Sequence, residues 1–216
     1  MQRVIVPYVR VREAPPAEPV SLADAKAWCR IDSDDTAQDG MVNLLIAAAR
    51  ARCEDLMGRA LVTRKLELRL DDFPRSSDRA GRVIEIPMPP LISIDYVQYL
   101  DANGALQTMD ASPSTWLEDT GGQPGRIEPL AQLCWPDTQC TVGSVRIGFT
   151  CGYAPAAGSP TDYGSNVPPV AKQWLQARIS TWYDNRGHLD MERLAELPRD
   201  FVDGLLDGIN ANRGFA

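Results

Sequence analysis

The sequence is poor in the residues that build metal and nucleophilic sites. It contains one histidine, His188, and five cysteines with no Cys-x-x-Cys pair among them. A structural zinc site needs four ligands at defined spacings, and a serine or cysteine nucleophile needs a base such as histidine, so material for either site is scarce. The odd number and irregular spacing of the cysteines favour reduced thiols over a disulfide framework. We therefore expect no metal and no cofactor.

Signatures of other enzymes are missing as well. The chain has no phosphate-binding loop, dinucleotide fingerprint, nucleophile elbow or kinase motif. Acidic residues are plentiful, so one alternative is a hydrolase that uses a carboxylate pair, or a carboxylate with His188, held in one cleft. Because most acidic side chains of a protein are simply solvated, we predict that the protein is not an enzyme.

Long apolar runs are missing too. No stretch of 18 apolar residues occurs, so we expect no membrane-spanning helix. Arg3, Arg10 and Arg12 interrupt the apolar residues near the N-terminus, so we expect no signal peptide and a protein that stays in the cell that makes it. The 22 Lys and Arg are outnumbered by 29 Asp and Glu, for a net charge of -7. This balance argues against a broad basic surface that grips nucleic acid, but it allows a protein past which DNA slides.

The N-terminal part of the chain is predicted to be an extended arm followed by two helices. Prolines deny residues 1–20 a helix, so this arm is either disordered or lies on a neighbouring chain. Ser21 can cap a first helix with Asp24 at the reciprocal position. Its apolar face is Leu22, Ala25, Trp28 and Cys29.

The second helix is the best-patterned element. The acidic stretch 32–39 before it matches an EF-hand loop at three positions but lacks the required Gly and Glu, so we interpret it as a helix start and not as a calcium site. Apolar residues then recur at helical spacing, and Gly58 is placed to end the helix. These residues are Val42, Leu45, Ile46, Ala49, Cys53 and Leu56.

Over residues 61–151 the apolar period becomes two, which predicts strands. Apolar and polar residues alternate in three runs: Leu66, Leu68 and Leu70; Ile92, Ile94 and Tyr96; Val145, Ile147 and Phe149. Asn103-Gly104 is a hairpin signal, and frequent Pro and Gly separate further short strands. We interpret this segment as a small antiparallel β sandwich or barrel-like module that interrupts a helical protein, which gives an α+β fold class.

After a linker over residues 152–167, helical signals return. Pro168 and Pro169 open a segment with two neighbouring rows of apolar residues: Val170, Trp174, Ala177 and Thr181; Leu175, Ile179 and Trp182. A helical turn over 191–197 and a last helix follow. We expect residues 21–58 and 168–216 to pack as one helical bundle, because neither segment has enough apolar surface alone.

The last helix has an apolar face and two glycines. Phe201, Val202, Leu205, Leu206 and Ile209 form the face. Gly204 and Gly208 are four apart and so on one side of an α-helix, where another backbone can approach closely. This helix either docks on a partner or covers the chain's own bundle.

Five stretches are informative by their order along the chain. They are Glu18–Asp32, Met57–Leu66, Ile84–Val97 running into the hairpin at 101–104, Phe149–Tyr153, and Val167–Lys172 leading to Trp182–Arg186. In this order they resemble the head-tail connector (adaptor) proteins of long-tailed bacteriophages. The resemblance covers residues 18–187 and is to the longer form of that family, in which a β module interrupts a helical bundle.

This resemblance implies a structural virion protein with no catalytic residues. Copies would form a ring, of 12 subunits, below the portal, extend the DNA channel, and join head to tail through the next neck or tail-completion protein. The protein would assemble in the host cytoplasm and end in the virion neck, with no membrane partner and no sequence-specific DNA binding. The candidate portal interface is then Phe201, Val202, Gly204, Leu205, Gly208 and Ile209.

A ligand- or carbohydrate-binding β module of a virion is the alternative function. It would need exposed aromatic side chains on one sheet face, and Trp116 and Trp135 are its candidates. A tryptophan in a small β core is more often buried.

Overall fold

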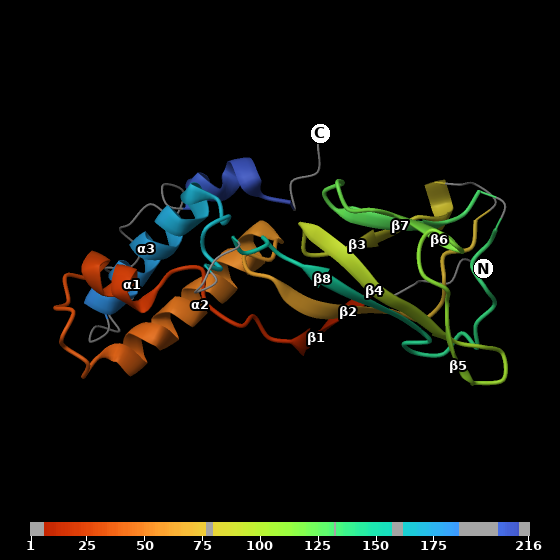
Figure 1. Ribbon diagram of the computed structural model, residues 1–216, viewed down its shortest axis with the longest axis horizontal. Helices are drawn as coiled ribbons and strands as arrows, with labels where there is room; N and C mark the ends of the chain where they lie inside the picture. The colour runs from red at the N-terminus through yellow and green to blue at the C-terminus, as the bar shows by residue number, and fades with distance from the viewer. Residues whose placement is uncertain (1–6, 77–79, 132, 157–161, 186–202, 212–216) are drawn as a thin grey trace. The chain divides into compact units, whose positions relative to one another are not determined.

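The computed structural model describes residues 7–76, 80–131, 133–156, 162–185 and 203–211 (Figure 1). The chain divides into two compact units. Residues 1–15 and 63–152 form the sheet unit, and residues 16–62 and 153–216 form the helical unit. Within the described ranges, no helix is both long enough and apolar enough to cross a membrane.

The helical unit contains three α-helices and a short 3₁₀ helix in its described part: α1 (Leu22–Trp28), α2 (Asp39–Met57), α3 (Pro169–Asp184) and η2 (Gly204–Ile209). Ser21 caps α1 as expected, because the backbone N–H of Asp24 donates to its hydroxyl oxygen at 3.0 Å. Gly58 ends α2 with a φ of 62°, a left-handed conformation that favours glycine. Pro169 is the first residue of α3, where its missing N–H costs nothing.

One apolar core holds the helical unit together. It contains residues of α1, α2, α3 and η2, and its largest fully buried side chains are Trp174, Met57, Leu61, Leu175, Ile179, Val42 and Val62. The two helical segments of the sequence therefore bury their apolar faces against each other. Tyr163 and Val167, within the expected linker, also pack in or against this core.

Two residues predicted for apolar helix faces are exposed instead: Trp28 at 48% and Val170 at 38%. An α-helix turns by about 100° per residue, so Ala25 and Cys29 share one side of α1 while Trp28 projects about 60° beyond Ala25. Lys26 is buried in its place. In α3 the buried row is Ala171, Trp174, Leu175 and Ile179. The predicted row of Val170, Ala177 and Thr181 lies on the flank of this face.

The sheet unit consists of two antiparallel sheets. The five-stranded sheet has the order β1 (Tyr8–Glu13), β2 (Arg64–Leu70), β8 (Val145–Cys151), β4 (Leu91–Leu100) and β5 (Leu106–Thr108). The three-stranded sheet has the order β3 (Ile84–Ile86), β7 (Gly125–Pro129) and β6 (Trp116–Asp119), with the 3₁₀ turn η1 (Ala80–Arg82) before β3.

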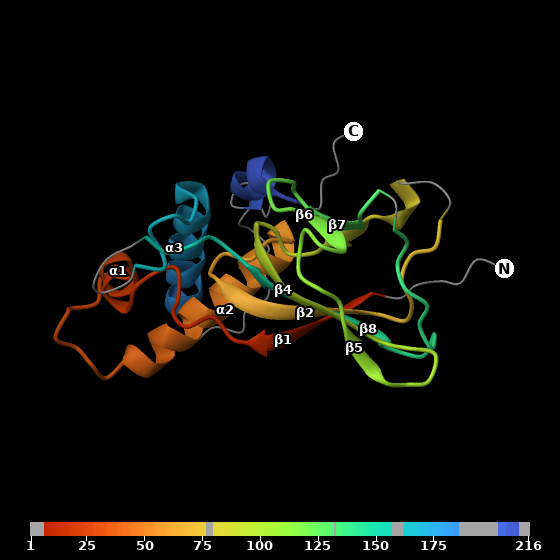
Figure 2. The same cartoon turned by 45° about the vertical axis from the view of Figure 1, so that its right-hand side comes forward.

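The α+β class is confirmed, but the barrel-like form is wrong for the strands that the structure describes. Each sheet is open, since β1 and β5 end the larger sheet and do not pair with each other. Figures 1 and 2 both show the smaller sheet lying over one face of the larger one. The two layers are close: a Cβ on Gly125 of β7 would lie 2.6 Å from Cδ2 of Leu91 in β4.

The predicted alternation holds for β2 and β8 but only in part for β4, where Ile94 lies opposite the buried Phe149 as expected. Leu66, Leu68 and Leu70 of β2 lie opposite the buried Phe149, Ile147 and Val145 of β8. In β4 the register shifts at Leu91/Ser93 and again at Ile94/Tyr96. Each shift changes which face the following side chains occupy. Ile92 is therefore exposed and Tyr96 lies on the polar face, whereas Val97 is buried.

Part of the predicted arm is a strand of the protein's own sheet. β1 pairs with β2 from Tyr8 opposite Arg69 to Glu13 opposite Lys65. Neither alternative considered for the arm included this pairing. The prolines flank the strand, and the alternation of Val9 and Val11 with arginines is the pattern that could have identified it.

The chain passes between the two units three times, after β1, before β2 and after β8. β1 and β8 are both antiparallel to β2. Glu13 therefore lies opposite Lys65, and Cys151 lies opposite Arg64. All three passages start from the same end of the larger sheet.

Candidate interaction surfaces

The predicted portal interface is only partly described. Phe201, Val202 and the predicted turn at 191–197 lie outside the described residues, as does His188. Leu206 of η2 is 2% exposed and belongs to the core, and Ile209 packs against it. Gly204 and Gly208 are exposed, and a Cβ on either would meet no atom within 4 Å.

The shared face predicted for the two glycines is wrong because η2 is a 3₁₀ helix. With three residues per turn, positions four apart differ by about 120° around the axis and do not line up. Each glycine is nevertheless exposed to solvent, with free space where a side chain would be. The described C-terminal residues thus cover their own bundle through Leu206 and present two positions without side chains to solvent.

Polar contacts tie this segment to the bundle. Asp203 Oδ1 accepts hydrogen bonds from Trp174 Nε1 at 3.1 Å and from Arg178 at 2.9 Å. The Ala211 N–H donates to the carbonyl of Met57 at 2.8 Å. Burial, with the nearby carboxylates of Glu54 and Asp203, raises the pKa of the Cys53 thiol to about 12.

The acidic loop between α1 and α2 is organised by a buried ammonium group. Lys26, 5% exposed, donates from Nζ to the carbonyls of Asp35 at 2.9 Å and Ser33 at 3.4 Å, and it pairs with the carboxylate of Asp39. The lysine thus supplies the positive charge that a metal ion supplies in an EF-hand loop. No cluster of three or more metal-ligating side chains occurs in the described ranges.

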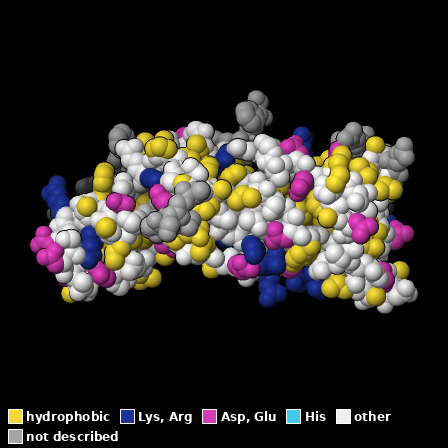
Figure 3. Space-filling view, in the orientation of Figure 1, with side chains coloured by type: hydrophobic (Ala, Val, Ile, Leu, Met, Phe, Trp, Pro, Cys, Tyr) yellow, Lys and Arg dark blue, Asp and Glu magenta, His cyan; other side chains and the backbone are white. Residues whose placement is uncertain are grey.

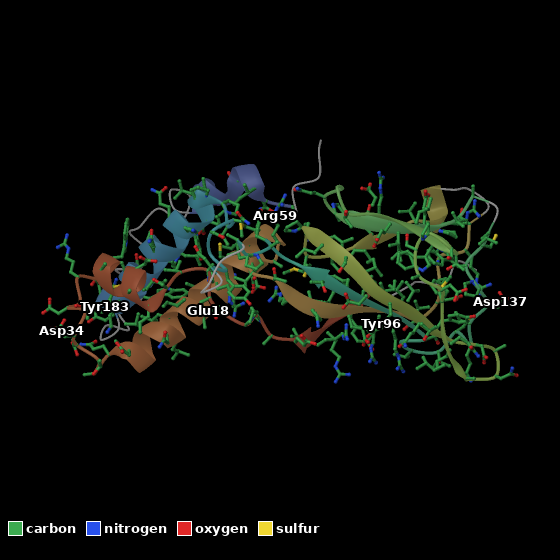
Figure 4. The ribbon with its side chains drawn as sticks, viewed as in Figure 1. Glu18, Asp34, Arg59, Tyr96, Asp137 and Tyr183 are labelled. Atoms are coloured by element: carbon green, nitrogen blue, oxygen red, sulfur yellow. The ribbon has the colours of Figure 1, made fainter. Side chains whose placement is uncertain are left out.

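The larger sheet has a polar side that the smaller sheet does not cover, and we call it the open face. Arg12 lies 4.8 Å above the ring of Tyr96, whose hydroxyl donates to Glu67. Figure 4 shows Tyr96 on this side. The register adds Arg10, opposite Glu67, and Arg146, opposite Arg69.

Ion pairs order the open face. Arg69 donates to Glu67 at 2.6 Å, Arg12 to Asp95 at 3.0 Å, and Lys65 to Glu13 at 3.1 Å. Burial alone would raise the pKa of the Glu67 carboxyl. The hydrogen bonds from Tyr96 and Arg69 outweigh burial, so this pKa lies below its usual value.

The aromatic candidates for a carbohydrate site are buried. Trp116 is 3% and Trp135 6% exposed. Trp135 stacks on Phe73 with ring centroids 4.8 Å apart and donates from Nε1 to the carbonyl of Arg82 at 2.7 Å. Neither ring is available to stack on a sugar.

A groove in the helical unit contains three acidic residues, each with a structural contact. It is lined by residues 17–22, Asp24, Asn43, Ile46, 162–164, Lys172 and Gln176. Glu18 accepts a hydrogen bond from Arg50 at 2.7 Å, Asp24 joins the α1 cap, and Asp162 accepts from the N–H of Gly164. Each of these three acids therefore has a structural partner.

The chain has two compact units, ordered polar surfaces, and acidic residues that serve caps and ion pairs. Residues 19–87 match the family model of phage gp6-like head-tail connector proteins. This match confirms the resemblance expected from the sequence, and the family is one of structural connectors and not of enzymes. A comparison with curated proteins gave no match.

Solved structures share the fold along almost the whole chain. A chain in the "Neck of empty GTA particle computed with C6 symmetry" is 20% identical, with a TM-score of 0.74, and the match covers 97% of this chain and 98% of that one. A chain in the "Virion of native gene transfer agent (GTA) particle" is 19% identical, with a TM-score of 0.70 and coverage of 96% and 97%. A chain in the "Neck of native GTA particle computed with C12 symmetry" is 20% identical, with a TM-score of 0.62.

Proposed function

We propose that the chain is the head-tail connector of a phage-like particle. Its copies form a ring, of 12 subunits, below the portal in the virion neck, extend the DNA channel, and carry the next neck or tail-completion protein. The observation that carries this proposal is the agreement of two matches. One is the connector family over residues 19–87, and the other is the fold of chains in two neck structures over 97% of this chain.

Particle assembly without the protein tests this function. Particles made without the chain should accumulate as filled heads that lack tails, and supplying the chain should restore tail attachment. Electron microscopy of the wild-type particle should place the chain between portal and tail. Normal tailed particles in its absence would reject the proposal.

A ring on the portal, and not in free solution, is the expected form. The isolated protein should be a monomer or weakly associated, and should form the ring when the portal is added. Light scattering measures both states. A stable ring of the isolated protein at micromolar concentration would show that the portal is not needed as a template. It would not contradict the connector function.

DNA should pass through the ring without being held. The net charge of -7 predicts non-specific duplex binding weaker than about 10⁻⁴ M at physiological salt. Tight, salt-sensitive binding of duplex DNA in a filter or anisotropy assay would contradict a passive channel.

For the portal interface we propose the segment that holds Phe201, Val202, Gly204, Leu205, Gly208 and Ile209. Leu206 belongs to the core, so deleting the segment would destabilise the protein for an unrelated reason. Alanine at Gly204 and Gly208 is the sharper test, because a Cβ there meets nothing in the free protein. The double variant should keep its melting temperature and bind the portal at least about tenfold more weakly, since two methyl groups obstruct close approach. Unchanged portal affinity would remove the two glycines from the interface.

We also propose that residues 21–58 and 168–216 form a bundle that folds without the β module expected over 61–151. Residues 1–15 belong to the sheet unit, so the test deletes them together with residues 63–152. A flexible linker then joins residue 62 to residue 153. The product should be soluble and helical by circular dichroism. A product that only aggregates would contradict this organisation.

A further inference from the structure

We propose that the open face of the larger sheet binds the acidic α1–α2 loop of a second copy of this chain. This inference rests on the proposed ring and names the two surfaces that form its subunit contact. A ring of identical subunits needs two different, complementary surfaces on each copy, because every contact joins one surface of a copy to the other surface of its neighbour.

The open face has an excess of positive charge in an acidic protein. It carries five cations, Arg10, Arg12, Lys65, Arg69 and Arg146, and three carboxylates, Glu13, Glu67 and Asp95. The whole chain has a net charge of -7. Figure 3 shows Lys and Arg side chains gathered where β1 and β2 run. The face is therefore suited to an acidic partner.

Two arginines of this face form no ion pair in the described part of the chain. The three ion pairs use Arg12, Lys65 and Arg69 and leave Arg10 and Arg146. Arg10 is exposed, and the Nε atom of Arg146 is buried without a hydrogen-bond partner. The exposed guanidinium of Arg10 therefore has donors available for a carboxylate, whereas the positive charge of Arg146 already helps to lower the pKa of Glu67.

The face is also flat and ordered. Gly148 contributes no side chain, and the Tyr96 ring lies over it: a Cβ there would be 2.6 Å from Cζ of that ring. The hydroxyl of Tyr96 is fixed by Glu67, and Asp95 accepts a hydrogen bond from Thr150 at 3.0 Å. An ordered face loses little conformational entropy when a partner binds.

The α1–α2 loop is the complementary surface. Asp32, Asp34 and Asp35 fall within four positions, and the first two are exposed. Lys26 fixes the loop from inside through backbone carbonyls, so its ammonium does not neutralise Asp32 or Asp34. Figure 4 shows Asp34 at this loop, and Figure 3 shows carboxylates gathered there.

An acidic protein surface fits the open face better than duplex DNA. Binding to DNA depends on many cations that neutralise phosphates, with a strong dependence on salt. Three of the five cations here are already paired within the chain. The exposed Arg10, with the charge of Arg146 behind it, matches a short acidic loop more closely than a phosphate backbone.

A charge swap tests the contact. Arg10→Glu or Asp34→Arg alone should raise the protein concentration needed for ring assembly on the portal at least about tenfold, because like charges then meet across the interface. The double variant with both substitutions should return to within about threefold of wild type. Native mass spectrometry or light scattering at low and high salt measures the ring.

Matched controls isolate the effect. Arg52→Glu and Asp55→Arg make the same charge changes at exposed positions of α2 and should leave assembly unchanged. Circular dichroism should show that all variants fold, since Arg10 and Asp34 are exposed.

Three outcomes overturn the inference. The first is that Arg10→Glu assembles as well as Arg52→Glu, and the second is that the double variant does not regain ring assembly. The third is that Arg10→Glu removes salt-sensitive DNA binding while the ring still forms, which would make the face a phosphate site. Failure of the proposed function is distinguishable, because the wild type would then form no ring on the portal. Sedimentation of concentrated wild-type and variant protein would still measure the contact between copies in that case.

Discussion

Replacing Lys26 by methionine should destabilise the helical unit markedly. The substitution keeps most of the chain length and apolar stem but removes an ammonium group that is 5% exposed. It leaves the carbonyls of Ser33 and Asp35 and the carboxylate of Asp39 without their cation. The acidic loop then has no internal positive charge.

The magnitude follows from these contacts. A hydrogen bond to a charged group contributes about 1.5–3 kcal/mol, and breaking a buried ion pair costs about 3–5 kcal/mol. The side chain of Asp39 is 30% exposed and regains some hydration, and the 3.4 Å contact to Ser33 is weak. We therefore expect a loss of about 3 kcal/mol in the free energy of unfolding.

Urea unfolding followed by circular dichroism at 222 nm measures this loss. With an m-value of about 1.5 kcal/mol per M, the midpoint should fall by about 2 M. Lys172→Met is the matched control, because the half-exposed side chain of this lysine in α3 makes no hydrogen bond in the described residues and the substitution should cost less than about 0.5 kcal/mol. A loss below about 1 kcal/mol for Lys26→Met, or one equal to the control, would refute the role of the ammonium in ordering the loop.

Three further predictions concern the sheet unit and the thiols. Burial raises the pKa of the Asp72 carboxyl, but hydrogen bonds from Arg75, Thr138 and Cys140 outweigh burial and lower it. The ionised Asp72 carboxylate thus adds to the free energy of unfolding at neutral pH, and this contribution is lost as the pH falls through the folded-state pKa. Asp72→Asn should therefore flatten the dependence of the free energy of unfolding on pH below about pH 4. Gly148→Ala should cost about 1–3 kcal/mol in a melting experiment, because the new methyl group meets the ring over it, whereas Gly40→Ala, in open space on α2, should gain up to about 1 kcal/mol. A thiol reagent at pH 8 should label the exposed Cys134 quickly, and should label Cys53, whose pKa is about 12, only on unfolding.

Each of these predictions has a contradicting result. An acid-unfolding profile of Asp72→Asn that superimposes on wild type would show that the carboxylate does not stabilise the fold. Equal melting temperatures for the two alanine variants would show that the open face has room at Gly148. Labelling of Cys53 at the rate of Cys134 in native protein would contradict a closed helical core.

The sequence predicted best the elements whose apolar pattern is regular. The cap at Ser21, the buried row of α2 and the alternation of β2 and β8 were all expected, because one period holds from end to end in each. In β4, Ile94 was assigned to the correct face but Ile92 and Tyr96 were not, since the register shifts interrupt the alternation and no residue type marks them. The sequence analysis therefore placed Tyr96 on the apolar face, whereas it lies on the open face.

Other residues were missed because tertiary contacts decide them. The burial of Lys26 depends on carbonyls that approach it only when the loop folds back. The 3₁₀ form of η2 depends on packing of Leu206, in a segment where two glycines weaken the preference for an α-helix. The open face joins β1, β2, β8 and β4, and its cations are up to 136 positions apart, from Arg10 to Arg146. No local spacing rule could have assembled it.

The three passages of the chain between its units have a mechanical consequence. A connector that holds a tail to a head bears tension, and here β1, β2 and β8 share any load applied between the units. All three leave the same end of the sheet, so a pull draws them in one direction and does not slide them past one another. The sliding force falls instead on the ladder between β8 and β4, which runs from Leu91 opposite Cys151 to Tyr99 opposite Val145. Hydrogen bonds along such a ladder break together under shear, so we expect this strand pair to be the part of the larger sheet that resists extension.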